Sequence, residues 1–191
     1  MKLASTDGST DVSQVIAALD WVAQHRTDNG MNVRVVNLSF GTSSLQAYQL
    51  DPLAAAAENA WRQGLVVVAP GGNGGAKATS LTDPAIDPYV IAVGSSDPNN
   101  KVDGWRNHPR VADYSSRGSA ERHVDLLAPG RSVVGLSAPG SCVDVNNPQG
   151  RLSVTGPGVC SAARVPRRPR QGSVAPPRCS CKRTRSSHRT R

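Results

Sequence analysis

Residues 65–75 read Leu65-Val66-Val67-Val68-Ala69-Pro70-Gly71-Gly72-Asn73-Gly74-Gly75. The apolar run that opens this stretch predicts a strand buried on both faces, which is typical of a parallel sheet covered by helices. The glycine-rich residues that follow predict a loop at the carboxyl end of that strand. In open α/β sheets the reactive groups gather at the carboxyl ends of the strands. This stretch therefore indicates both the fold class and the place to look for a site.

The segments around this strand alternate between helix and strand. Helical spacing of apolar residues predicts a helix over residues 11–25, and β-branched residues predict a strand over 33–38. A second helix is predicted over 53–62, opened by Pro52 and closed by Gly64. Further strands are predicted over 89–93, 124–127 and 132–134. The alternation predicts an α/β layer fold, with a second glycine-containing loop after residue 38 at the same sheet edge.

The formal net charge of +8 belongs to one end of the chain. Residues 162–191 hold 10 of the 22 Lys and Arg residues and none of the 14 Asp and Glu residues, so residues 1–161 carry a net charge of −2. Val165 and Val174 are the large aliphatic residues of this basic segment, which is too few to form a helix or strand face. We therefore expect a folded domain over 1–156 and a disordered tail, rich in Arg, Pro and Ser, over 157–191.

Cysteine use and hydropathy argue against several classes of protein. The four cysteines begin only at Cys142, so they are too few and too late in the chain for a disulfide framework. Cys179, Cys181 and His188 do not supply the four ligands of a structural zinc site, and no metal or cofactor is expected. No apolar run approaches the roughly 18 residues of a membrane helix, and no apolar export signal is visible at the start of the sequence. No membrane association is predicted, and the cellular location is left open.

Four segments, taken in their order along the chain, resemble those of a known protein family. They are Val35-Val36-Asn37-Leu38-Ser39-Phe40-Gly41, residues 65–75, Tyr89-Val90-Ile91-Ala92-Val93-Gly94, and Tyr114-Ser115-Ser116-Arg117-Gly118 followed by Val124-Asp125-Leu126-Leu127-Ala128-Pro129-Gly130. Together they resemble the subtilisin family of serine proteases, the subtilases, over about residues 1–156. The resemblance implies a three-layer parallel α/β sheet of the subtilisin type, truncated at its N-terminal side and lacking the helix that carries the nucleophile. It also implies peptide or protein substrates and relatives that are usually secreted.

The resemblance implies that the three catalytic residues are missing from this sequence. The family carries its Asp and its His earlier than the segment matched by residues 1–10, and no histidine here has the His-Gly-Thr-His setting. The family's Ser lies in a Gly-Thr-Ser motif, where this sequence has Gly156-Pro157-Gly158, so Gly158 occupies the nucleophile position. His25, His108, His123 and His188 are interpreted as solvated side chains, Asp113 and Asp125 as loop or strand-end carboxylates, and Ser153 and Ser161 as unactivated hydroxyls.

The resemblance also implies which site residues remain. Asn73 matches the side chain that donates to the oxyanion of the tetrahedral intermediate. Residues Ser39, Phe40, Gly41, Pro70, Gly71 and Gly72 match the two segments that flank the substrate, where an extended peptide pairs like an added strand. The alternative for Asn73 is that asparagine occurs there because it tolerates the left-handed backbone of a turn. The alternative for the two segments is that they are only turns at the ends of strands.

Two functions stay open from the sequence. The first is a piece of a serine endopeptidase that is catalytically incompetent by itself, because oxyanion stabilisation without a nucleophile and base gives only residual acceleration. The second is a non-catalytic protein that binds peptides in the remaining groove or polyanions through the basic tail. Because the absent helix and strand would normally cover the sheet, we also expect Val66, Val67 and Ile91 to be exposed and the chain to be prone to aggregation.

Overall fold

The structure is a computed structural model of the 191-residue chain. It describes residues 9–97 and 110–131, together with Met1, Leu3, Val145 and the short segments 133–136, 148–152 and 162–164. None of the helices in this part of the chain is long and apolar enough to span a bilayer.

Two helices form where helical spacing predicted them. Helix α1 spans Val12–His25 and begins at Asp11, whose side chain accepts a hydrogen bond from the Ser13 amide. Helix α2 spans Pro52–Arg62 and begins at Asp51, whose side chain accepts from the amides of Leu53 and Ala54. Both carboxylates satisfy backbone N–H groups that a helix start leaves without partners. Short 3₁₀ turns occur at Asp28–Gly30, Tyr48–Leu50 and Gly75–Lys77.

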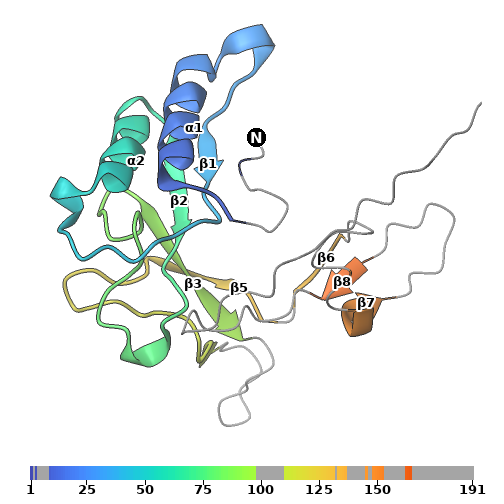
Figure 1. The fold of residues 1–191 in the computed structure, drawn as a ribbon. Helices are drawn as coiled ribbons and strands as arrows, with labels where there is room; N and C mark the ends of the chain where they lie inside the picture. The colour runs from blue at the N-terminus through green and yellow to red at the C-terminus, as the bar shows by residue number, and fades with distance from the viewer. Residues whose placement is uncertain are drawn as a thin grey trace, which may run out of the picture.

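The central sheet has five strands in the described residues, and most of them are parallel. Strands β1 (Val35–Asn37), β2 (Val66–Pro70) and β3 (Ile91–Asp97) are parallel neighbours in that order. Strand β5 (Leu126–Pro129) pairs in parallel with β3, and β4 (Arg110–Val111) pairs antiparallel with the end of β3. This arrangement confirms the predicted α/β class and brings the ends of β1 and β2 to one edge (Figure 1).

A second, smaller sheet has three antiparallel-paired strands. Strand β8 (Ala162–Arg164) lies between β6 (Val134–Leu136) and β7 (Arg151–Leu152), and a 3₁₀ turn at Pro148–Gly150 precedes β7. Strand β8 lies within residues 157–191, for which the sequence predicted no regular structure.

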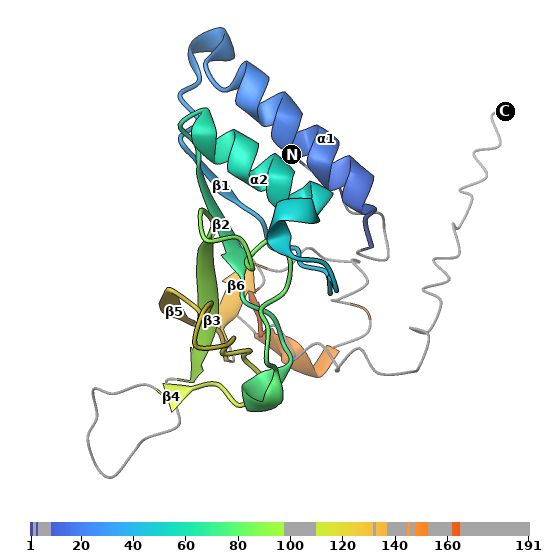
Figure 2. The same ribbon diagram turned by 90° about the vertical axis from the view of Figure 1, so that its left-hand side faces the viewer.

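Helices α1 and α2 lie side by side over one face of the central sheet (Figure 2). The core between them and the sheet is built from small and branched apolar side chains. Its members include Val15 and Leu19 of α1, Leu53, Ala57 and Ala60 of α2, and Val67, Ala69 and Ala92 of the strands. The small alanine side chains of α2 let the helix pack closely against the sheet.

The opposite face of the central sheet carries exposed apolar side chains. Side chains alternate between the two faces along a strand, so Val66 lies on the face opposite Val67. Val66 is 40% exposed whereas Val67 is 0% exposed, and Ile91 is half-buried. The expected exposure is therefore confirmed for Val66 and wrong for Val67, which packs in the helix-covered core. The prediction that β2 is buried on both faces is also wrong, because Val66 is exposed on one of them.

Candidate functional site

The loop that follows β2 is held on both sides of Asn73. The Gly72 carbonyl accepts a hydrogen bond from the Ser116 amide at 3.0 Å, and the Gly74 amide donates to the Ser116 hydroxyl oxygen at 2.9 Å. The Gly75 amide donates to the Tyr114 carbonyl at 2.9 Å. Asn73 itself is exposed at the tip of this loop. These hydrogen bonds fix the loop backbone on both sides of Asn73.

Glycine at position 72 is required by the backbone and by its neighbours. Its φ is +111°, a region that L side chains rarely adopt. A Cβ at this position would come within 2.7 Å of the Thr82 methyl carbon and 3.0 Å of the Ser116 hydroxyl oxygen. The residues on both sides of the loop therefore approach its backbone more closely than a side chain would allow.

Ser115 and Ser116 support this candidate site, and neither is among the site residues that the sequence predicts. Both are buried, and the Ser115 hydroxyl oxygen accepts a hydrogen bond from the Ser95 amide at 2.9 Å. The turn at residues 114–116 thus joins β3 to the loop that carries Asn73. The signal in the sequence was a pair of serines between Tyr114 and Arg117, but burial of serine is not visible without the fold.

The loop that follows β1 lies against the segment 81–83. Thr42 and Asp83 exchange two backbone hydrogen bonds, with the Thr42 amide donating at 3.0 Å and the Asp83 amide donating at 2.9 Å. Ser39 and Gly41 are exposed and Phe40 is half-buried. A Cβ on Gly41 would come within 2.8 Å of the Thr82 hydroxyl oxygen. Residues 39–41 are therefore kept in register with Thr82.

Thr82 also binds the loop that follows β2, so it connects the two predicted substrate segments. Its amide donates to the Gly71 carbonyl at 3.0 Å, and its hydroxyl donates to the Pro70 carbonyl at 2.9 Å. Pro70 and Gly72 are half-buried, whereas Gly71 is buried beneath Val124. The structure therefore brings residues 39–41 and 70–72 together at the carboxyl ends of adjacent strands, with Gly71 as a buried support.

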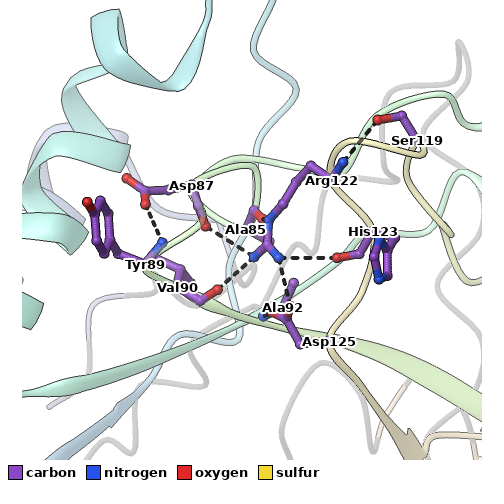
Figure 3. Close-up of polar contacts among 9 residues, drawn as sticks. All are labelled: Ala85, Asp87, Tyr89, Val90, Ala92, Ser119, Arg122, His123 and Asp125. Carbon is purple, nitrogen blue, oxygen red and sulfur yellow. Dashed lines mark hydrogen bonds and ion pairs between the residues drawn. The ribbon is translucent and has the colours of Figure 1, made fainter.

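Arg122 holds the segment that leads into β3 (Figure 3). Its guanidinium donates to the carbonyls of Ala85, Asp87 and Val90 at 3.0, 3.1 and 2.7 Å. It also donates to the Asp125 carboxylate at 2.8 Å, and that carboxylate accepts from the Ala92 amide at 2.7 Å. Arg122 thereby fixes the position of residues 85–90, which continue the segment that joins the two loops.

The carboxylates of Asp113 and Asp125 are both paired with arginine. Asp113 pairs with Arg131, which also pairs with Asp97 at 2.6 Å, and Asp125 pairs with Arg122. Burial alone would raise the pKa of Asp125, but hydrogen bonds from Arg122 and the Ala92 amide hold that pKa below its ordinary value. These pairings fit the interpretation of both residues as loop or strand-end carboxylates.

The two histidines in the described residues are His25 and His123. The His25 ring stacks on Trp21 at 4.4 Å and its Nδ1 lies 2.8 Å from the Trp21 carbonyl oxygen, at the end of α1. His123 is exposed. Within the ranges that the structure describes, no three His, Cys, Asp or Glu side chains are grouped to hold a metal ion. His108, Ser153, the Gly156-Pro157-Gly158 segment, Ser161, Cys179, Cys181 and His188 lie outside the described residues.

The fold and site define a class of protein: a helix-covered parallel α/β sheet with two connected loops at the carboxyl ends of adjacent strands. The chain belongs to the subtilase family, whose model matches residues 1–163. It is 32% identical over 150 residues to Serine protease AprX of Bacillus subtilis (strain 168), covering 75% of this chain and 34% of that protein. It is 33% identical over 135 residues to Subtilisin-like protease 1 of Trichophyton equinum, covering 70% of this chain and 23% of that protein.

Two solved structures are similar to the described fold and confirm the predicted truncated α/β fold of the subtilisin type. The S41 Psychrophilic Protease aligns with a TM-score of 0.60 and 26% identity, covering 71% of this chain and 44% of that one. Sphericase aligns with a TM-score of 0.60 and 28% identity, covering 70% of this chain and 43% of that one. The chain thus spans about a third or less of these two curated relatives and less than half of these structural neighbours.

Proposed function

We propose that these 191 residues bind extended peptides between residues 39–41 and 70–72 and do not hydrolyse them. The observation that carries the proposal is that Thr82 and Asp83 hydrogen-bond to both loops. They bind the loop after β1 through Thr42 and the loop after β2 through Pro70 and Gly71. Two loops held in register at one sheet edge offer backbone groups to a peptide that pairs as an added strand.

Asn73 supplies a donor to the bound peptide in this proposal. Asn73 is an exposed residue next to Gly72, on a loop held by Ser116. In subtilisin, removal of the corresponding oxyanion donor costs roughly 3–4 kcal/mol of transition-state stabilisation. A donor in this position hydrogen-bonds a peptide carbonyl even when no tetrahedral intermediate forms.

The absence of hydrolysis follows from the nucleophile position. Gly158 stands where the family motif places serine, and glycine has no oxygen that attacks a carbonyl. A serine elsewhere needs an aligned base within hydrogen-bond reach to become a nucleophile. Oxyanion stabilisation alone leaves only residual acceleration. The proposal is therefore a subtilase segment that retains recognition and lacks turnover.

Fluorescence anisotropy with a labelled extended peptide tests the binding. We expect saturable binding that weakens in Asn73→Ala and is unchanged in Asn59→Ala, a matched exposed asparagine on α2. A chromogenic peptide and a serine-directed fluorophosphonate test the chemistry, and we expect neither hydrolysis nor labelling. Hydrolysis or labelling would overturn the inactive assignment, and absence of saturable binding would overturn the peptide-binding assignment.

The basic tail supports a second candidate function, salt-sensitive binding of polyanions. Residues 162–191 contain 10 Lys and Arg residues and no Asp or Glu residue. Release of counterions therefore favours binding of this segment to phosphate or sulfate polymers. The segment has no Phe, Trp or Tyr for stacking on bases, so binding is expected to be blind to sequence. Heparin affinity that falls steeply with salt, and that is lost in a chain shortened to residues 1–161, is the expected result. Equal heparin affinity of the shortened chain would show that the tail is not the polyanion-binding segment.

A further inference from the structure

The residue pair Asn73-Gly74 is one of two Asn-Gly pairs in the sequence, and the other is Asn29-Gly30. Asparagine is thermolabile in proteins. It loses its side-chain amide most readily before glycine, because no side chain on the next residue shields the backbone nitrogen that attacks. Both asparagines are exposed. Loss of the amide from Asn73 would change a residue on which the proposed peptide binding depends.

Deamidation of Asn73 needs only water besides the atoms of Asn73 and Gly74. The Gly74 amide nitrogen gives up its proton to a base in solution and attacks the Asn73 Cγ atom, so that a new C–N bond forms. The Cγ–Nδ2 bond breaks, and Nδ2 takes up a proton and leaves as ammonia. Water then opens the cyclic imide at either of its carbonyl carbons, which leaves an aspartyl or an isoaspartyl residue at position 73.

The packing around position 74 requires glycine there. A Cβ on Gly74 would come within 2.7 Å of the Ala78 Cβ and within 3.2 Å of the Ser116 hydroxyl oxygen. The first of these distances is shorter than the contacts that Cβ atoms make in proteins. A larger residue that would shield the backbone nitrogen is therefore excluded, and protection of Asn73 is left to hydrogen bonding.

The Ser116 hydroxyl engages the nitrogen that would attack. The Gly74 amide donates to the Ser116 hydroxyl oxygen at 2.9 Å, and Ser116 is 1% exposed. Before the pair, the Gly72 carbonyl accepts from the Ser116 amide at 3.0 Å. After it, the Gly75 amide donates to the Tyr114 carbonyl at 2.9 Å. The Gly74 nitrogen therefore has to break its hydrogen bond before it can lose its proton and reach Cγ of the preceding residue.

We propose that Asn73-Gly74 is a deamidation site restrained by the Ser116 hydroxyl, and that the deamidated chain loses affinity for peptide. A carboxylate at position 73 accepts hydrogen bonds but donates none, so it repels the carbonyl oxygen that the Asn73 side chain would bind. An isoaspartyl residue also lengthens the main chain by a methylene group, which moves Gly74 relative to Ser116. The loss of affinity rests on the proposed function, whereas the modification itself does not.

Tandem mass spectrometry of the full chain, kept at mildly alkaline pH, measures the loss of the side-chain amide at Asn73 and at Asn29 over time. A synthetic peptide of residues 70–77 gives the rate at Asn73 without the fold. We expect Asn73 to react at least about fivefold more slowly in the chain than in the peptide, because the Gly74 hydrogen bond must first open. Equal rates in the chain and the peptide would overturn the proposal.

Ser116→Ala removes the acceptor and is expected to raise the rate at Asn73 at least about fivefold. The rate at Asn29 should stay the same, and the exposed control Ser43→Ala should change neither rate. An unchanged rate at Asn73 in Ser116→Ala would overturn the proposal. If that variant fails to fold, amide exchange of the unmodified chain decides. Exchange and deamidation both need the Gly74 nitrogen released, so its protection factor should match the ratio of peptide to chain deamidation rates, and a clear mismatch would exclude the restraint.

Peptide binding by the aged chain separates this inference from the proposed function. We expect the bound fraction to fall in step with the fraction of Asn73 that keeps its amide, and to fall faster in Ser116→Ala. Failure of the fresh chain to bind peptide would overturn the proposed function and leave the mass-spectrometric result as it is. Undiminished binding after Asn73 has been converted would overturn the stated loss of affinity.

Discussion

At the scale of single residues, Arg122 shows how one planar side chain can replace a regular hydrogen-bond ladder. The segment 85–90 has no strand partner among the described residues before β3 begins, yet three of its carbonyls accept from the Arg122 guanidinium. A guanidinium presents five N–H donors in a fixed geometry, which an ammonium group does not. Arg122 therefore determines the course of a segment that lies more than 30 residues earlier in the chain.

Arg122→Met is expected to lower the free energy of unfolding by roughly 2–4 kcal/mol, because the carbonyls of the buried residues Ala85 and Val90 lose the guanidinium that donates to them. The control is Arg62→Met, since Arg62 is exposed and forms an ion pair with Glu58 along α2. Urea unfolding at low protein concentration measures the free energy of unfolding of both variants. A midpoint for Arg122→Met equal to that of Arg62→Met would show that the network in Figure 3 contributes no stability.

Ser116 has a similar role on the other side of the site. Ser116→Ala removes the acceptor of the Gly74 amide, and we expect that amide to lose protection equivalent to about 1–3 kcal/mol. Hydrogen exchange at Gly74 measures the effect, and the exposed Ser43→Ala is the control. Unchanged exchange at Gly74 would mean that the backbone pair between Ser116 and Gly72 holds the loop without help from the hydroxyl.

At the scale of secondary-structure elements, β2 has two different faces. Val67 packs beneath α1 and α2, whereas Val66 lies on the opposite, uncovered face. The run of valines hides this difference, because all three have the same hydropathy and the same preference for strands. The alternation of the strand and the position of the two helices decide which valine is in the core.

The pair Val67→Ala and Val66→Ala tests the two faces with the same change of side chain. Val67→Ala removes about two buried methyl groups and leaves a cavity, so we expect a loss of roughly 2–3 kcal/mol in the free energy of unfolding. Val66→Ala is expected to cost less than about 0.5 kcal/mol. Urea unfolding of both variants gives the comparison. Equal losses would mean that β2 is covered on both faces in solution.

At the scale of the whole molecule, the uncovered sheet face is the main liability. Val35 and Val66 are direct partners in the β1–β2 register, and Leu126 is also exposed. Contiguous exposed apolar surface promotes association. The chain covers less than half of the two solved structures with which it aligns, so a large part of each has no counterpart in this chain. We therefore propose that the isolated chain is prone to aggregation.

Leu126→Lys on this face is expected to reduce aggregation and the fluorescence of a bound hydrophobic dye several-fold, because a charge disfavours association of apolar surfaces. Leu45→Lys, at a fully exposed position in the loop between β1 and α2, is the matched control and should change neither signal. Light scattering and dye fluorescence during warming measure both variants. Equal aggregation of Leu126→Lys and the unmodified chain would place the association surface elsewhere.

The sequence by itself determined the order of helices and strands and the position of the two loops, because caps, periodicity and glycine act over a few neighbouring residues. It also determined the family through motifs around Asn73 and residues 39–41. Only the tertiary structure decided that Val67 is buried while Val66 is exposed, that the Ser116 hydroxyl holds the Gly74 amide next to Asn73, and that Thr42 pairs with Asp83. Those contacts join residues more than 30 positions apart, and burial, which sets their strength, depends on the assembled layers and not on local sequence.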